Sequence, residues 1–120
     1  MSAPHLRSHF ALLIGPGERA EDFLGPLMTS LASPVFHLDA AAPAFPSTVV
    51  GTLIVRNVER LAAAHQEQFL QWLDAQIEIA RVITTSPKSL FPHVLRGTFS
   101  ERLYYRLNTV IVELNSSPKQ

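Results

Sequence analysis

The sequence predicts an α/β fold with a five-stranded parallel sheet and helices on both faces. Five short apolar runs have the length of buried strands, and they alternate with segments of helical periodicity. The runs are mainly apolar and do not alternate with polar residues, which is typical of strands covered on both faces. With 120 residues, 47% of them hydrophobic, the chain fits one domain (1–120) with a packed core over 10–114. We expect 1–9 to be a flexible arm and 115–120 a flexible tail.

The first strand is expected at Phe10–Ile14, because this apolar run is followed by the turn formers Gly15-Pro16-Gly17. Apolar residues at helical spacing and acidic residues in the first turn predict a helix over 18–31. The Gly25-Pro26 pair inside that stretch predicts a kink or a break. A second short strand is expected at 34–38.

Residues 40–48 show no periodicity and form a connection to a third strand at 51–55. The most regular helical segment is 58–75, whose apolar stripe we expect to face the core while Gln66 lies on the polar side. Phe69 and Trp72 in that stripe are interpreted as core residues.

A fourth strand is expected at 79–84, and Pro87 ends it. A short helix over 99–107 and a fifth strand at 109–114 complete the expected order of elements.

Composition and charge exclude several classes of function. The chain has no cysteine, so disulfides, zinc–thiolate sites and cysteine nucleophiles are excluded. Its net charge is zero, and we expect no direct DNA binding, since such binding depends on phosphate neutralisation. No apolar run is long enough to span a bilayer, and the N-terminus lacks the apolar stretch of a signal peptide, so we expect a cytoplasmic protein. We expect no metal or cofactor, because the histidines lack metal-ligand spacing: His5, His9, His37, His65 and His93.

In a parallel sheet, ligands bind beyond the carboxyl ends of the strands. Asp39 follows the second strand, and we interpret it as a turn-capping residue rather than an acid or a phosphoacceptor. A phosphoacceptor receiver domain shares the five-strand plan but needs an aspartate at the end of the third strand, where this chain has Arg56-Asn57.

Three segments in the second half of the chain carry a family resemblance. Residues 51–59 (GTLIVRNVE), 80–90 (ARVITTSPKSL) and 97–108 (GTFSERLYYRLN) resemble the Walker B, sensor I and arginine-finger segments of the sigma-54-dependent, enhancer-binding transcriptional activators. Residues 12–15 and 35–41 are similar to that family's first two strands. The resemblance implies a three-layer, P-loop NTPase-like (AAA+) core.

The phosphate-loop positions depart from the family pattern. A P-loop needs a glycine, a lysine and a hydroxyl to hold phosphate and Mg²⁺. Counted from Gly15, those positions hold Ala20, Glu21 and Asp22. A unit charge pair about 4 Å apart is worth about 4 kcal/mol at an effective dielectric near 20, so replacing lysine by glutamate turns an attraction of this size into a repulsion.

The other nucleotide-site positions depart as well. The Walker B acids that hold Mg²⁺ correspond to Arg56 and Asn57, and the sensor I Thr-Asn pair corresponds to Ser86-Pro87. The first arginine of the last motif corresponds to Ser100, so Arg106 remains as the candidate intersubunit contact. The alternative for Arg106 is a structural role in a helix that packs its aromatic residues on the sheet.

Two further family features are missing from the sequence. The resemblance implies a long insertion between the second and third strands, carrying the GAFTGA loop that contacts sigma-54, but only 42–50 joins them here. It also implies a helical lid after the fifth strand, whereas this chain ends six residues after Leu114, so we expect no C-terminal lid.

The resemblance and these departures together predict a non-catalytic pseudo-ATPase module that acts by protein–protein contact. The predicted partner is an intact AAA+ activator or a second copy of the chain, the latter as a homodimer. The alternative is a weak nucleotide-binding, ATPase-like domain of a transcription regulator.

Overall fold

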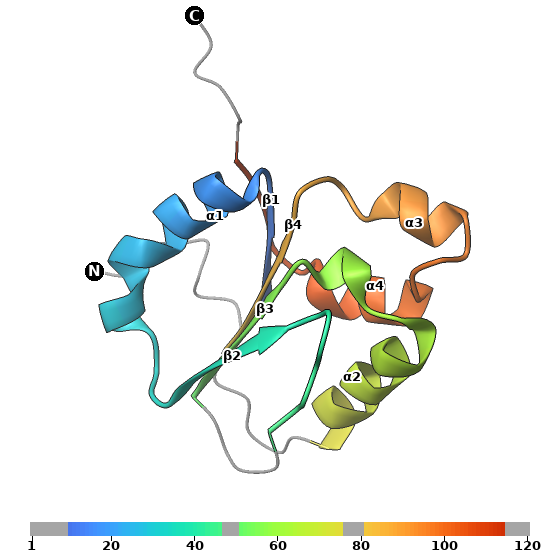
Figure 1. Ribbon diagram of the computed structural model, residues 1–120, viewed down its shortest axis with the longest axis horizontal. Coiled ribbons are helices and arrows are strands. Elements are labelled where there is room, and N and C mark those ends of the chain that lie inside the picture. Colours follow the sequence, from blue (N-terminus) through green and yellow to red (C-terminus); the bar gives the residue numbers. More distant parts are fainter. Residues whose placement is uncertain (1–9, 47–50, 76–80, 115–120) are drawn as a thin grey trace, which may run out of the picture.

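A five-stranded, all-parallel sheet forms the centre of the molecule, as the sequence predicts. The computed structural model describes residues 10–46, 51–75 and 81–114. The strands lie in the order β2-β3-β4-β1-β5, and every neighbouring pair is parallel (Figure 1). Their bounds are β1 Phe10–Ile14, β2 Val35–Asp39, β3 Thr52–Arg56, β4 Arg81–Ser86 and β5 Ile111–Glu113.

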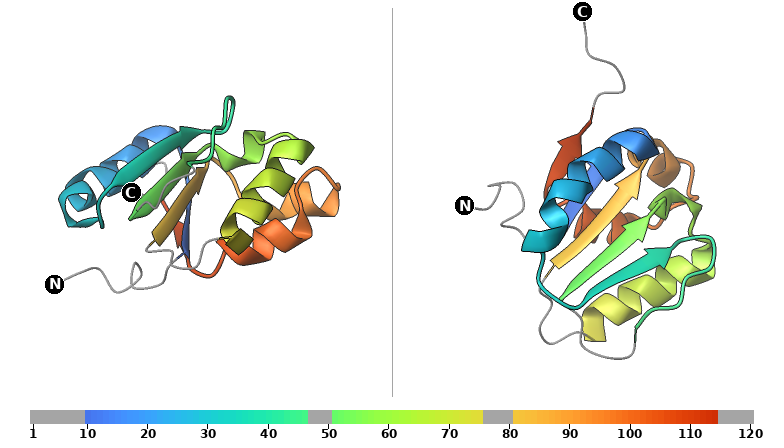
Figure 2. Two further views of the ribbon diagram at one scale, coloured as in Figure 1. Left: turned by 90° about the horizontal axis from the view of Figure 1, so that it is seen from below. Right: turned by 60° about the vertical axis from the view of Figure 1, so that its left-hand side comes forward.

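Helices cover both faces of this sheet, which confirms the three-layer prediction (Figure 2). Leu12 and Leu13 are adjacent in β1 and both fully buried, yet they belong to different core clusters because successive strand side chains point to opposite faces. Leu12 packs with residues of α2 and α4, and Leu13 packs with residues of α1. The helices are α1 Gly17–Leu24, η2 Gly25–Ser30, η3 Val58–Arg60, α2 Ala63–Ala75, α3 Phe91–Leu95 and α4 Glu101–Leu107.

Two predicted helices are shorter in the structure than in the sequence analysis. The segment 18–31 divides at Gly25-Pro26 into α1 and the 3₁₀ helix η2, as the predicted break requires. The segment 58–75 does not start as an α-helix, because Asn57 adopts a left-handed conformation (φ 57°) and a single 3₁₀ turn follows it. The α-helix α2 therefore begins only at Ala63.

Other boundaries move by one or two residues. The second and third strands each start one residue later than predicted, the fourth extends to Ser86, and the fifth is confined to 111–113. Helix α4 begins at Glu101, because the hydroxyl of Ser100 caps it by accepting a hydrogen bond from the Leu103 N–H (3.1 Å). Helix α3 was not predicted at all. The predicted arm and tail, and residues 79–80 of the predicted fourth strand, lie outside the described residues.

The prediction for Gln66 is wrong, because its side chain is buried. Its amide nitrogen donates to the carbonyl oxygens of Leu61 (2.9 Å) and Thr98 (3.0 Å). Its amide oxygen accepts from the Ser100 N–H (2.7 Å). Gln66 thus ties α2 to the segment before it and to the loop that leads into α4.

The connection after β2 lies flat against α2. Phe45 stacks on Phe69 with ring centroids 5.1 Å apart, and the Trp72 indole N–H donates to the Pro46 carbonyl (2.7 Å). Phe69 is fully buried and Trp72 packs against the same cluster, so both are core residues as predicted. In the described part of the chain, no helix has the length and apolarity needed to cross a bilayer.

Candidate functional site

The predicted site residues gather at the carboxyl ends of β1, β3 and β4. Gly15 directly follows β1, Arg56 is the last residue of β3, and Ser86 is the last residue of β4. Ile14 and Ser86 are register partners, and the Gly15 N–H donates to the Ser86 carbonyl (2.9 Å). The ends of these strands therefore form one continuous edge, at which a ligand of a parallel sheet would be expected.

The segment after β1 is helical almost from its start. Helix α1 begins at Gly17, and the Ala20 N–H already donates to the Pro16 carbonyl (3.0 Å). Ala20, Glu21 and Asp22 consequently lie inside α1, not in a loop whose N–H groups are free to surround a phosphate. Ala20 is buried against the sheet, while Glu21 and Asp22 are exposed.

Gly15 serves a packing function at this edge. A Cβ at this position would lie 2.5 Å from the Leu114 carbonyl oxygen and 2.8 Å from the Leu114 Cβ. The glycine therefore lets the chain after β5 approach β1, where the Leu114 N–H donates to the Ile14 carbonyl (2.7 Å).

Glu21 and Arg56 form a bidentate ion pair between α1 and β3. Arg56 Nε lies 2.6 Å from Glu21 Oε2, and Nη2 lies 3.1 Å from Oε1. The third guanidinium nitrogen, Nη1, lies 2.8 Å from His37 Nδ1. Because a guanidinium can only donate, this histidine nitrogen is the acceptor.

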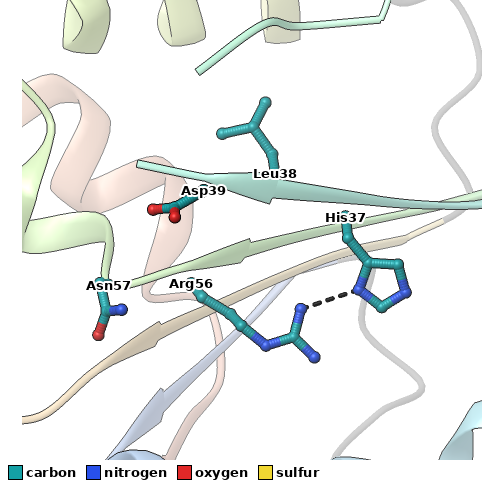
Figure 3. A pocket seen from close by; sticks show the side chains of 5 residues that line it. All are labelled: His37, Leu38, Asp39, Arg56 and Asn57. Carbon is teal, nitrogen blue, oxygen red and sulfur yellow. Dashed lines mark hydrogen bonds between the residues drawn. The ribbon is translucent and has the colours of Figure 1, made fainter. Parts of the chain in front are cut away.

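His37 and Arg56 also line a shallow cavity of about 230 Å³ with Leu38, Asp39 and Asn57. Figure 3 shows the Arg56 guanidinium turned toward the His37 ring. Asp39 caps a turn, as predicted, because its Oδ1 accepts from the Ala41 N–H (3.0 Å). The Arg56 guanidinium, the cationic group of the cavity, is therefore already hydrogen-bonded to Glu21 and His37 of the same chain.

The remaining predicted site residues are held by backbone contacts. The Asn57 N–H donates to the Thr85 hydroxyl (3.0 Å), and the Ser86 hydroxyl donates to the Lys88 carbonyl (2.6 Å). Among the residues that the structure describes, no group of three His, Asp or Glu side chains could hold a metal ion.

Arg106 lies away from this edge. Its Nη1 contacts Asp74 Oδ1 of α2 at 2.6 Å, so it joins α4 to α2. The predicted intersubunit contact stays a prediction, and a neighbouring subunit would have to compete with Asp74 for this guanidinium.

The ion pair makes stability depend on pH through Glu21. The hydrogen bond from Arg56, reinforced by the charge of that guanidinium, holds the pKa of Glu21 below its ordinary value. A depressed pKa means that the pair contributes stability at neutral pH and loses it as pH falls through the folded-state pKa. Because Glu21 is half exposed, the contribution is at most about 1 kcal/mol.

We therefore expect Glu21→Gln to lower the urea midpoint at pH 7 and to have a smaller effect well below the ordinary glutamate pKa of about 4.3. Glu67→Gln on the exposed side of α2 is the matched control, because it makes the same change at a carboxylate that forms no ion pair with the described residues. A Glu21→Gln effect that does not change with pH would mean that the pair adds no stability.

With the geometry established, a family model for the sigma-54 interaction domain matches residues 26–116, well over half of the chain. The chain belongs to this family. The match begins after α1, so it includes Arg56, Asn57, Ser86 and Arg106 but not the phosphate-loop positions.

A curated relative of this sigma-54 interaction domain is YplP of Bacillus subtilis (strain 168), which its name describes as a sigma L-dependent transcriptional regulator. The two are 37% identical over 70 residues, which is 58% of this chain and 20% of YplP. This domain thus spans about a fifth of the length of that relative.

Solved structures show the same fold. NtrX from Brucella abortus, solved in complex with ADP, superimposes with a TM-score of 0.73 at 19% identity, over 92% of this chain and 33% of NtrX. The P-loop NTPase domain of a sigma-54 activator from E. coli gives a TM-score of 0.57 at 15% identity, over 92% of this chain and 87% of that domain. The sigma-54 interaction domain described here therefore has the P-loop NTPase fold that the sequence predicts.

His37 and Thr85 are site residues that the sequence analysis missed. His37 of β2 and Ile54 of β3 are register partners, and Arg56 lies two positions after Ile54. Residues two positions apart in a strand point to the same face, so His37 and Arg56 lie on the face of the sheet that α1 covers. This neighbourhood follows from the strand register, which the sequence pattern does not provide.

Proposed function

We propose that this sigma-54 interaction domain is a non-catalytic module of sigma-54-dependent transcription regulation that acts by protein–protein contact. The observation that supports it is the Glu21–Arg56 ion pair. By the family resemblance these two positions correspond to the phosphate-binding lysine and a Mg²⁺-binding acid. Here their charges are exchanged, and the two side chains satisfy each other.

Electrostatics argue against a triphosphate at this edge. A carboxylate at position 21 repels phosphate oxygens, and a guanidinium at position 56 repels Mg²⁺. Moreover, Ala20 and Glu21 lie inside helix α1. A tight turn at Gly15-Pro16 therefore stands where a P-loop protein has a wide loop that binds the phosphates.

Nucleotide titration tests this proposal. We expect no saturable heat and no thermal shift with ATP or ADP and Mg²⁺ at low millimolar concentrations. Glu21→Lys alone should not restore hydrolysis, because Arg56 and Asn57 still offer Mg²⁺ no carboxylate.

Micromolar affinity for ATP would contradict the proposal and favour the alternative, a weak nucleotide-binding domain of a transcription regulator. That alternative has some support from the shared fold, since NtrX was solved in complex with ADP. A likeness of fold at 19% identity, however, does not by itself transfer a binding site.

The proposed partners are an intact activator of the same family or a second copy of this chain. Direct contact with sigma-54 is not part of the proposal. The described part of the β2–β3 connection is held on α2 by Phe45 and Trp72, and the connection as a whole is short. Any influence on sigma-54 would then pass through an intact activator.

A further inference from the structure

Large apolar side chains on α3 and α4 are exposed to solvent. Leu95 is 71% exposed, Tyr105 60% and Phe91 45%. Such exposure at neighbouring positions marks interaction surfaces in soluble proteins. We call the exposed side chains of Phe91, Leu95 and Tyr105 the aromatic patch; Tyr104, which is only 9% exposed, belongs to the core beneath it.

The buried Tyr104 connects the parts of the aromatic patch on the two helices. Phe91 and Leu95 are four residues apart on α3 and share one helix face. The Phe91 ring centroid lies 6.1 Å from that of Tyr104, and Tyr104 meets Tyr105 edge-on at 5.3 Å. Helix α3 lies at the outer margin of the described chain, to the right in Figure 1.

Positive charge borders the aromatic patch. Arg96 directly follows Leu95, and Arg102 lies three residues before Tyr105, on the same side of α4; Glu101, four residues before Tyr105, is the one acidic residue there. No ion pair joins either arginine to a carboxylate of the described residues. The chain is neutral overall, but the segment 87–108 has one acidic residue, Glu101, against four basic ones: Lys88, Arg96, Arg102 and Arg106, of which Arg106 is paired with Asp74.

We propose that the aromatic patch binds an acidic, amphipathic segment of a protein partner. Apolar side chains of that segment pack on Phe91, Leu95 and Tyr105, and its carboxylates pair with Arg96 and Arg102. Exposed aromatic and arginine side chains are the groups that protein interfaces concentrate, and guanidinium groups favour carboxylates. Two arginines without a carboxylate partner among the described residues are too few for the phosphate neutralisation that nucleic-acid binding requires. The inference rests on the proposed protein-contact function and adds the surface and the chemistry of the partner.

Fluorescence anisotropy with the full chain tests this docking. The probe is a labelled helical peptide with leucines on one face and glutamates on the other, and the matched probe has lysines in place of the glutamates. We expect the acidic peptide to bind and the basic peptide to bind at least about tenfold more weakly, since each 1.4 kcal/mol is a factor of ten. A labelled oligothymidine should not bind.

Variants then assign the binding to the aromatic patch. Leu95→Ser and Tyr105→Ser should each weaken it about tenfold, as expected for side chains at the centre of an interface. Arg102→Glu should weaken it about fivefold, and less at about 0.5 M salt. Arg60→Glu is the matched control, because it makes the same charge change at an exposed arginine of η3 outside the patch. All four side chains are exposed enough that unchanged melting curves are expected.

Three outcomes would overturn the inference. The first is failure of the acidic peptide to bind, or equal binding of both peptides. The second is tight binding of oligothymidine, which would assign the surface to nucleic acid. The third is a stable dimer by light scattering that Leu95→Ser and Tyr105→Ser convert to monomer, which would assign it to a second copy. Nucleotide titration is independent of these results, so ATP binding would contradict the proposed function without deciding the role of the patch.

Discussion

Replacing Gln66 by leucine is expected to destabilise the domain by about 3 kcal/mol, because buried polar groups that lose their partner cost about 1–3 kcal/mol each. The Gln66 amide satisfies the carbonyls of Leu61 and Thr98 and the N–H of Ser100. Leucine has a similar volume but offers none of these hydrogen bonds. For a domain of this size the melting temperature should fall by about 10–20 °C.

Gln68→Leu is the matched control, since Gln68 lies on the exposed side of the same helix and the change in helix propensity is the same. It should alter the melting temperature little. If Gln66→Leu were equally mild, the three hydrogen bonds would contribute nothing that water could not replace, and the loop before α4 would not depend on α2.

The strands were predictable because they are buried on both faces. Leu53, Ile54 and Val55 in β3 are all fully buried, and an uninterrupted apolar run is the sequence signal of such a strand. Strand ends were less predictable. Arg56 and Ser86 have polar side chains, yet the backbone of each is paired with the neighbouring strand. This pairing uses backbone hydrogen bonds, which do not depend on the type of side chain.

Helix α3 could not be predicted from periodicity. It has five residues, includes Pro92, and begins where Leu90 accepts hydrogen bonds from the N–H groups of His93 and Val94. A single turn of this length shows no 3.6-residue pattern. Its position depends on tertiary contacts such as that between Phe91 and Tyr104.

The residues of the candidate site could be predicted one by one from the sequence, but the ion pair between two of them could not. From the sequence, Glu21 and Arg56 are predicted as two separate losses, one of a lysine and one of an acid. The contact between them depends on the position of α1 over the end of β3, because the two residues are 35 positions apart in the chain. One sequence signal did point to this contact. Relative to the family pattern, a positive residue is replaced by Glu21 and a negative one by Arg56, and two such opposite charge changes compensate each other when the residues are in contact.

Gly51 gives the second large effect: Gly51→Ala is expected to destabilise the domain by about 3 kcal/mol, the upper end of the usual cost of overpacking. A Cβ at Gly51 would lie 2.5 Å from the carbonyl oxygens of both Ala32 and Ser33. Backbone atoms cannot turn away as a flexible side chain can. Because the two segments lie this close, the Gly51 N–H donates to the Pro34 carbonyl (2.9 Å) and the Thr52 hydroxyl donates to the Ala32 carbonyl (2.9 Å). These hydrogen bonds fix the start of β3 beside β2.

Gly17→Ala is the control that isolates this steric cause. Gly17 is the first residue of α1, no proline follows it, and nothing lies within 4 Å of a Cβ placed there. Alanine at position 17 should therefore stabilise the domain by about 0.5–1 kcal/mol, through the entropy of the unfolded chain. Urea unfolding of both variants gives the comparison. Equal and small effects would contradict the close approach of β3 to the segment before β2, and with it the register that places Arg56 beside His37 and opposite Glu21.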